Sequence, residues 1–152
     1  MPQSDYFPPG AYNFSINIDG GSDEGPDALF QEVKGISMKL KMKAPVEQVG
    51  VTETRHEPEK TEYTPLVLKR GLLTIGSDLV TWCMESIQEF KAKPIRPKDI
   101  TVNLLDDTGD ILMSWSFTDA IPIEWTMSDF NAQQNGIVTE SMSFVYSSFR
   151  IV

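Results

Sequence analysis

The segment that decides the fold reads ITVNLLDDTGDILMSWSF and spans residues 100–117. Apolar and polar residues alternate over 100–104 and again over 111–117, so each run has the period of a β-strand with one buried face. Between the two runs, residues 106–110 combine aspartates with Thr108 and Gly109, a composition typical of a turn. Two alternating runs joined by a turn predict an antiparallel β-hairpin.

Further strands are predicted on both sides of this hairpin. Downstream, residues 121–127 place apolar side chains on one face, and residues 137–149 form a last strand long enough to bend or to change partners. Upstream, residues 12–18 alternate without a break, and residues 63–68 form a short strand in which Pro65 favours an edge position. With about seven strands and one helix, the sequence predicts a mainly β fold: two packed antiparallel sheets, as a sandwich or barrel, with one flanking α-helix.

One helix is predicted to begin after residue 76. Ser77 is a suitable N-cap, Asp78 suits the positive end of the helix dipole, and Pro94 ends the segment. The face expected to be buried carries an apolar stripe at helical spacing, formed by Leu79, Cys83, Ile87 and Phe90 with Val80 and Trp82 beside them. The cysteine is therefore predicted to be a core residue and not a catalytic thiol.

The segment 36–43, ISMKLKMK, also alternates completely. Its apolar residues share one strand face, and Lys39, Lys41 and Lys43 share the other. Two interpretations stay open with equal weight: the lysines protect an edge strand from aggregation, or they form a basic ribbon that pairs with an acidic surface on a neighbouring copy. The following residues 44–62 are polar, charged and interrupted by prolines, and are predicted to be a long loop or an extended hairpin arm.

Few residues could support catalysis or metal binding. The chain has one histidine, His56, and one cysteine, whereas metal sites usually draw on several such ligands. No glycine-rich phosphate-binding segment and no nucleophile–base motif is evident, so we expect neither an enzyme nor a bound cofactor or metal. The net charge of −9, from 22 acidic and 13 basic residues, also disfavours nucleic acid or an anionic membrane as a partner.

The length of 152 residues predicts a single domain over 1–152, because no linker or repeat divides the sequence. A lone cysteine forms no internal disulfide, and the first residues lack the basic start and apolar run of a signal peptide. The lack of a disulfide fits folding in a reducing cytosol, and no cleaved signal is expected to direct export. No run approaches the roughly 18 apolar residues that a membrane span needs.

An ordered set of short segments extends along nearly the whole chain: residues 12–20 (YNFSINIDG), 30–36 (FQEVKGI), 66–72 (LVLKRGL), Trp82, 102–106 (VNLLD), 115–117 (WSF), 120–122 (AIP), Trp125, 129–132 (DFNA), Glu140 and Tyr146. Together these segments resemble the tail tube family of contractile phage tails and extracellular contractile injection systems. The resemblance implies hexameric rings that stack into a hollow tube, surrounded by a sheath whose contraction drives the tube into a target. It also implies assembly in the bacterial cytoplasm, as part of a released phage-tail-like particle.

One region departs from the family pattern. Bulk tube subunits usually carry an acidic Gly-Gly-Asn segment and then a Leu-Pro-Gly-like stretch, where this chain has residues 44–56, APVEQVGVTETRH. Residues 6–10 add an aromatic-proline lead, YFPPG. In the family, altered arms accompany rings at special positions. The resemblance therefore favours the tube-initiator ring, which seats the tube on the spike hub, with the bulk repeating tube protein as an alternative.

The partners implied by the resemblance are other copies of the chain in a hexameric ring, the neighbouring ring and the spike hub protein. Six copies at −9 each would carry a formal charge of −54 per ring, so contacts between copies need charge complementarity. The candidates for these contacts are basic residues: Lys39, Lys41, Lys43, Arg55, His56, Lys69 and Arg70. From a different class, a small-molecule-binding β-barrel stays open, and it predicts a monomer with an internal apolar pocket.

Overall fold

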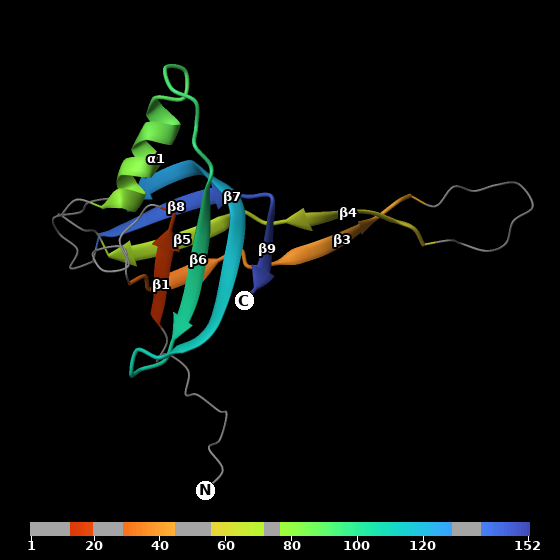
Figure 1. Ribbon diagram of the computed structural model, residues 1–152, viewed down its shortest axis with the longest axis horizontal. Coiled ribbons are helices and arrows are strands. Elements are labelled where there is room, and N and C mark those ends of the chain that lie inside the picture. Colours follow the sequence, from red (N-terminus) through yellow and green to blue (C-terminus); the bar gives the residue numbers. More distant parts are fainter. Residues whose placement is uncertain (1–12, 20–28, 45–55, 72–76, 129–137) are drawn as a thin grey trace, which may run out of the picture.

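The computed structural model describes residues 13–19, 29–44, 56–71, 77–128 and 138–152. These residues form nine strands and one helix (Figure 1): β1 (Asn13–Ile18), β2 (Glu32–Lys34), β3 (Met38–Met42), β4 (Pro58–Tyr63), β5 (Leu66–Gly71), α1 (Asp78–Gln88), β6 (Lys98–Leu105), β7 (Ile111–Met127), β8 (Thr139–Val145) and β9 (Ser148–Ile151).

The body of the molecule consists of two antiparallel layers that share the long strand β7. The first half of β7 pairs with β6 and β9, and the second half pairs with β8. The first layer has the order β1-β6-β7-β9, and the second has the order β7-β8-β5-β2. The predicted fold of two antiparallel sheets with a flanking helix is therefore confirmed. So is the predicted hairpin, which is formed by β6 and β7.

β7 changes layers at Asp119, which adopts a left-handed backbone conformation with φ of 52°. Aspartate tolerates this conformation better than most residues, and the Asp119 N–H donates to Asp99 Oδ1 at 3.0 Å. The expectation of a separate strand over 121–127 is wrong, because the chain bends here without leaving the sheet. Downstream, the predicted last strand divides into β8 and β9, which pair with opposite halves of β7, so its predicted change of partners is confirmed.

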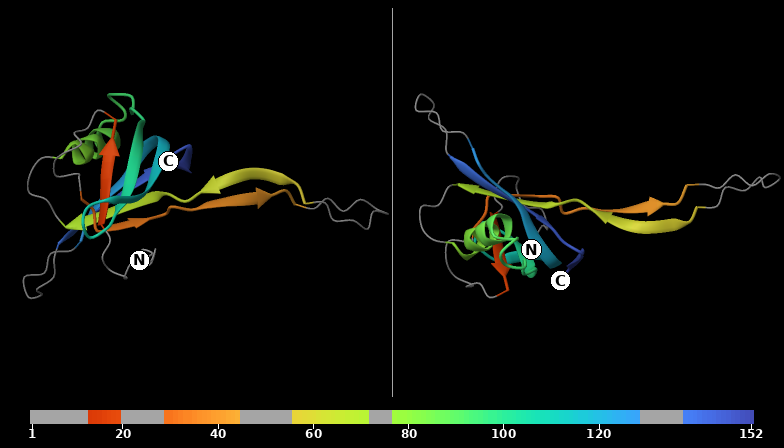
Figure 2. Two further views of the ribbon diagram at one scale, coloured as in Figure 1. Left: turned by 60° about the horizontal axis from the view of Figure 1, so that its bottom comes forward. Right: turned by 90° about the horizontal axis from the view of Figure 1, so that it is seen from above.

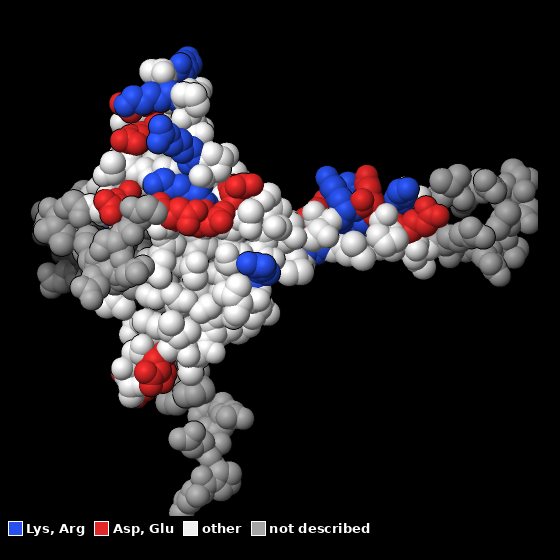
Figure 3. Space-filling model, viewed as in Figure 1, with Lys and Arg blue, Asp and Glu red and all other residues white. Residues whose placement is uncertain are grey.

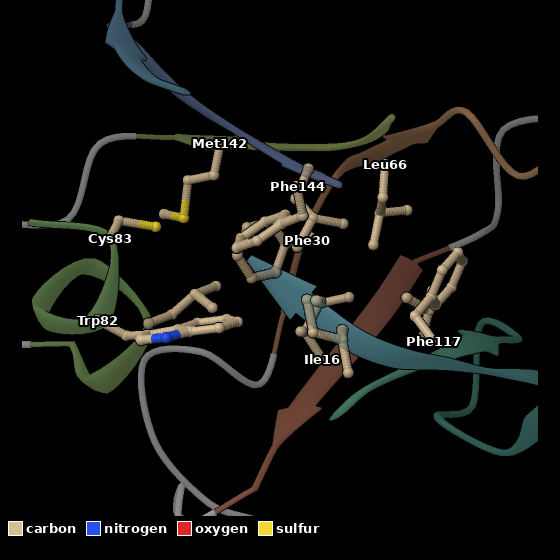
Figure 4. Packing of buried hydrophobic residues seen from close by; sticks show 13 residues of the cluster. Ile16, Phe30, Leu66, Trp82, Cys83, Phe117, Met142 and Phe144 are labelled. Carbon is tan, nitrogen blue, oxygen red and sulfur yellow. The ribbon is translucent and has the colours of Figure 1, made fainter. Parts of the chain in front are cut away.

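The core lies between the layers (Figure 4) and is filled by large apolar side chains. Phe30, Phe117 and Phe144 are each at most 1% exposed. At the edge of the body away from β7, Phe14 and Phe30 exchange two backbone hydrogen bonds of 3.0 and 2.7 Å. These bonds bring β1 of the first layer beside the residues that precede β2 of the second layer. These side chains occupy the space that an internal ligand pocket would need, which weighs against the small-molecule-binding barrel.

Helix α1 begins where the sequence predicts, because the Ser77 hydroxyl accepts the Val80 N–H at 3.2 Å. Its buried face consists of Leu79, Trp82, Cys83 and Ser86, so it shares three residues with the predicted stripe and adds Ser86. Phe90 is 53% exposed, because the helix ends at Gln88 and Phe90 lies beyond its last turn. Trp82 takes the core position and stacks on Phe144, with ring centroids 5.5 Å apart. Cys83 is fully buried, as predicted.

Strands β3 and β4 form a second, two-stranded sheet that projects from the body (Figures 1 and 2). We call residues 36–44 and 56–64, the described part of this hairpin, the arm. Of the two predictions for residues 44–62, the hairpin is observed, because β4 occupies residues that a continuous loop would leave irregular. The tip, residues 45–55, lies outside the described residues, as does the N-terminal lead over residues 6–10.

Candidate assembly surface on the projecting arm

One face of the arm is apolar and exposed. Antiparallel pairing sets Met38 opposite Tyr63 and Leu40 opposite Thr61, so these side chains lie on the same side of the hairpin. Met38, Leu40 and Met42 are 57%, 55% and 38% exposed. A sheet of two strands has no second layer of its own, so this apolar row has no cover within the described part of the chain.

The opposite face of the arm carries charges of both signs. Lys41 lies 3.7 Å from Glu59, and Lys43 lies 3.8 Å from Glu57, while Lys39 is opposite Glu62 in the strand register. Both measured ion pairs are about half exposed, so each contributes roughly 0–1 kcal/mol to stability. The three lysines do share a face, as the sequence predicts. That face is a mixed-charge surface and not a purely basic ribbon, because β4 supplies its own glutamates.

The root of the arm is fixed to the body by hydrogen bonds. The Tyr146 hydroxyl donates to the Thr64 carbonyl oxygen at 2.6 Å, with the Gly35 carbonyl oxygen 3.4 Å away. Across the root, the Ser37 and Thr64 hydroxyls lie 2.8 Å apart. Gly35 has φ of +88°, and a Cβ at this position would lie 1.9 Å from the Pro65 carbonyl oxygen. The close crossing of the two chain segments at the root therefore requires glycine.

An aromatic cluster joins the root to both layers of the body. The ring of Tyr63, the last residue of β4, lies 5.6 Å from the rings of Tyr146 and Phe149. Tyr146 in turn makes an edge contact with the buried Phe117, at 4.8 Å between centroids. Burial, and to a lesser extent the neighbouring Tyr63, raise the pKa of Tyr146 above 10.0. The arm is thus held in a defined direction by packing as well as by hydrogen bonds.

The structure separates the remaining predicted contact residues. His56 is exposed at the end of the arm, and Lys69 lies on the body, 4.0 Å from Glu32. Arg55 lies outside the described residues. Arg70 is only 2% exposed, so its side chain is not part of the surface of the subunit. Its inclusion among the contact residues is corrected, since a buried guanidinium cannot reach a neighbouring copy.

Arg70 instead belongs to a buried network that sequence reasoning missed. Its Nε donates to Glu140 Oε1 at 2.9 Å, and its Nη2 donates to the N-cap hydroxyl of Ser77 at 3.2 Å. Trp125 Nε1 donates to the second Glu140 oxygen at 3.1 Å. Arg70 and Glu140 are directly paired across β5 and β8, and the Phe30 ring lies 4.7 Å from the guanidinium carbon.

A signal for this network was present in the sequence. Leu66, Leu68 and Arg70 alternate on one face of β5, and Glu140 shares a face of β8 with two core residues. Because side chains alternate between the two faces of a strand, both charged residues fall on the face that points into the core. The network joins three strands to the start of α1, so it positions the helix against the sheets.

The described residues offer no metal site and no membrane helix. Within them, no group of three or more His, Cys, Asp or Glu side chains is placed to hold a metal ion. None of the helices found there has the length and apolar character needed to cross a bilayer.

Comparisons with known proteins agree with this fold. The family model described as "T4-like virus tail tube protein gp19" matches residues 10–150. Among solved structures, a chain of the anti-feeding prophage (AFP) baseplate is 19% identical, with a TM-score of 0.76 over 98% of this chain and 97% of that chain. No curated protein matches the sequence.

Two structures of an extracellular contractile injection system, PVC, are also similar. A chain of its sheath-tube complex in the extended state is 22% identical, with a TM-score of 0.73 over 99% of this chain and 93% of that chain. A chain of its sheath/tube terminator in the extended state is 23% identical, with a TM-score of 0.74 over 99% of both chains. At these identities the likeness concerns the fold.

Proposed function

Because the chain belongs to the T4-like virus tail tube protein gp19 family, we propose that it is a structural, non-enzymatic subunit of the inner tube of a contractile injection system. We assign it to the tube-initiator ring, a hexamer that joins the spike hub to the tube. The observation that carries the proposal is the projecting arm, which exposes an apolar row on one face and paired charges on the other.

The arm has the properties of a contact between copies. Covering Met38, Leu40 and Met42 with a neighbouring subunit would remove apolar surface from water, at about 25 cal/mol per Å². The mixed charges on the opposite face would fix the register of the contact and disfavour wrong partners. The root formed by Gly35 and Tyr146 sets the direction of the arm in the single subunit, which lowers the cost of ordering it on assembly.

The similar structures support a place in a multi-subunit particle. The AFP chain comes from a baseplate, and the two PVC chains come from a sheath-tube complex and a sheath/tube terminator. On this basis we propose that the protein assembles in the bacterial cytoplasm, with copies of itself, a neighbouring ring and a spike hub, and that it forms part of a released phage-tail-like particle.

The choice of the initiator over the bulk tube protein rests on sequence. The TM-scores for the baseplate, tube and terminator structures are 0.76, 0.73 and 0.74, so fold similarity is equally compatible with the repeating tube subunit. Residues 44–56 and 6–10 depart from the pattern of bulk subunits. An initiator binds unlike partners on its two sides, which gives a physical reason for a changed arm.

Electron microscopy of the purified protein, together with its mass in solution, tests the proposal. An initiator forms closed rings that stop, and it extends only when bulk tube subunits or the hub are added. A bulk tube protein polymerises alone into long tubes. A chain that stays monomeric at high concentration, with or without hub and tube proteins, would show that the proposal is wrong.

Reversing the lysine face tests whether the arm makes the contact. We expect Lys39→Glu/Lys41→Glu/Lys43→Glu to abolish ring formation, because the arm gains like charges facing an acidic particle. Circular dichroism and cooperative unfolding should show a folded body. Lys34→Glu, which reverses an exposed lysine of β2 that pairs with Glu32 at 3.1 Å, is the control and should assemble normally. Normal assembly of the triple variant would exclude the lysine face from the contact.

A further inference from the structure

Basic side chains gather at one end of the body, in the segment that connects α1 to β6. Residues 90–98 contain four cations, Lys91, Lys93, Arg96 and Lys98, and no acid, within a chain of net charge −9. Three of them line an open pocket of about 430 Å³ beside Trp82. Figure 3 shows the basic side chains at this end of the molecule.

The pocket walls are held in place by contacts to Trp82. The indole N–H donates to the Arg96 carbonyl oxygen at 3.0 Å, and Lys98 Nζ lies 5.8 Å from the centroid of the ring. Lys93 already pairs with Glu89 at 3.8 Å, and Glu85 also lines the pocket, so the positive charge available to a partner comes chiefly from Arg96 and Lys98. Lys98 Nζ also donates to the Asp19 carbonyl oxygen at 3.2 Å, which leaves its charge in place. Such a site fits a small group of carboxylates on a narrow loop.

A loop of this kind is present at the other end of the same strand. The β6–β7 turn, residues 106–110, carries Asp106, Asp107 and Asp110 and no cation. Asp106 Oδ1 accepts the N–H groups of Thr108 and Asp110, at 2.9 and 2.8 Å, which fixes the shape of the turn. These hydrogen bonds, led by that from the Thr108 side chain, lower the pKa of Asp106, so this carboxylate stays ionised near neutral pH.

The two charged ends point in opposite directions along the body. β6 runs from Lys98 to Leu105, so the pocket and the turn are separated by roughly 25 Å of strand. Both ends are visible in Figure 3, with basic residues beside some acidic ones at one extreme of the body and acidic residues at the other. Since the pocket and the turn are on different sides of one molecule, they can meet only between copies.

We propose that the Asp106–Asp110 turn of one copy docks in the Trp82–Arg96–Lys98 pocket of the next, forming a head-to-tail contact between subunits. This inference rests on the proposed function, because it requires that copies assemble. Head-to-tail contacts use two different surfaces and therefore build rings or open stacks. The charged ends lie across the direction of the arm (Figure 1), so this contact and the arm use different parts of the subunit surface.

A charge exchange tests the contact. Arg96→Glu and Asp107→Arg, as single variants, should each raise the protein concentration needed for assembly at least about tenfold, because like charges then face one another. The double variant Arg96→Glu/Asp107→Arg should assemble within about threefold of the wild type. Lys34→Glu is the control for charge alone. Single variants that assemble normally, or a folded double variant that is not restored, would overturn the inference.

Disulfide trapping adds a direct measurement on assembled particles. Mixed particles of Arg96→Cys and Asp107→Cys chains should form covalent dimers under mild oxidation, whereas particles of either variant alone should not, since Cys83 is fully buried. Assembled mixed particles without covalent dimers would reject the contact and leave the proposed function intact. A wild-type chain that does not assemble at all would reject both.

Discussion

Strand β5 of the body and strand β3 of the arm have the same alternating pattern but opposite environments. Leu66 and Leu68 of β5 are fully buried, whereas Met38 and Leu40 of β3 are 57% and 55% exposed. The difference lies in what faces them: β5 has a second layer and a helix, and β3 has only its partner strand. An isolated two-stranded hairpin is marginally stable in water. The body therefore stabilises the fold, and the exposed row of the arm is the surface that we propose for assembly.

The largest loss of stability is expected from a change at the buried ion pair of the body. Glu140→Ala removes the carboxylate that accepts from Arg70 at 2.9 Å and from Trp125 at 3.1 Å. It leaves a buried guanidinium without this partner, so we expect a loss of about 3–5 kcal/mol of unfolding free energy. Urea unfolding, followed by tryptophan fluorescence, measures this change in unfolding free energy.

The double variant Arg70→Met/Glu140→Leu separates the loss of the ion pair from the burial of a guanidinium that has lost its carboxylate. Replacing both partners with apolar side chains removes the uncompensated charge, so most of the stability should return. A double variant as unstable as Glu140→Ala would instead indicate that the hydrogen bonds to Ser77 and Trp125 dominate.

The root of the arm should show an intermediate effect. In Gly35→Ala the new methyl group meets the Pro65 carbonyl oxygen, and the residue keeps a φ of +88°, so we expect a loss of at least about 2 kcal/mol and a misdirected arm. Gly109→Ala is a matched control, because Gly109 has φ of +89° and nothing within 4 Å of its Cβ position. The control should lose only about 1 kcal/mol of unfolding free energy, which is the cost of holding an alanine in this backbone conformation. Equal losses in the two variants would contradict a crowded root.

Period two in the sequence was sufficient to predict the layers but not what covers each face. It predicted a short strand over residues 63–68, of which residues 66–68 lie in β5, and it identified the β6–β7 hairpin through its aspartate-rich turn. It could not show that Arg70 meets Glu140, because 70 residues separate them and only the β5–β8 pairing brings them together. Nor could it show that the arm lysines meet glutamates of β4, because the register depends on a bulge after Lys41.

The helix illustrates a second limit of sequence patterns. Ile87 and Phe90 continue a helical stripe that begins at Leu79, yet α1 ends at Gln88 and its buried face includes Ser86 in place of these two residues. The stacking of Trp82 on Phe144 decided the rotation of the helix, and this contact depends on tertiary packing. The bend of β7 at Asp119 was hidden for the same reason, since it depends on an acceptor from Asp99, 20 residues away.

The hydrogen bond at the root should have a smaller effect than the backbone crossing. Tyr146→Phe removes the hydroxyl that donates to the Thr64 carbonyl oxygen, and we expect a loss of about 1 kcal/mol. The pKa of Tyr146 is raised in the folded state, so its neutral form is favoured there. The resulting stability is present below pH 10 and is lost as the pH rises through the raised pKa of the folded state.

Unfolding measured from pH 8 to pH 11 tests this linkage. The difference in unfolding free energy between wild type and Tyr146→Phe should shrink above pH 10, because only the wild type must ionise this partly buried phenol. Tyr63→Phe is the control for the neighbouring ring, which contacts Tyr146 at 5.6 Å. A difference that stays constant over this range would exclude Tyr146 as the titrating group.

The smallest change in stability should accompany the largest change in assembly. Leu40→Ser alters a side chain that is 55% exposed, so the unfolding free energy should change by no more than about 0.5 kcal/mol. Ring formation, measured by sedimentation and electron microscopy, should nevertheless fail, because the apolar row loses its central residue. Leu29→Ser, at a side chain 60% exposed on the body, should leave both quantities unchanged. If Leu40→Ser assembles as well as Leu29→Ser, the exposed apolar row of the arm has no role in assembly. The arm and the body would then differ only in how their side chains are packed.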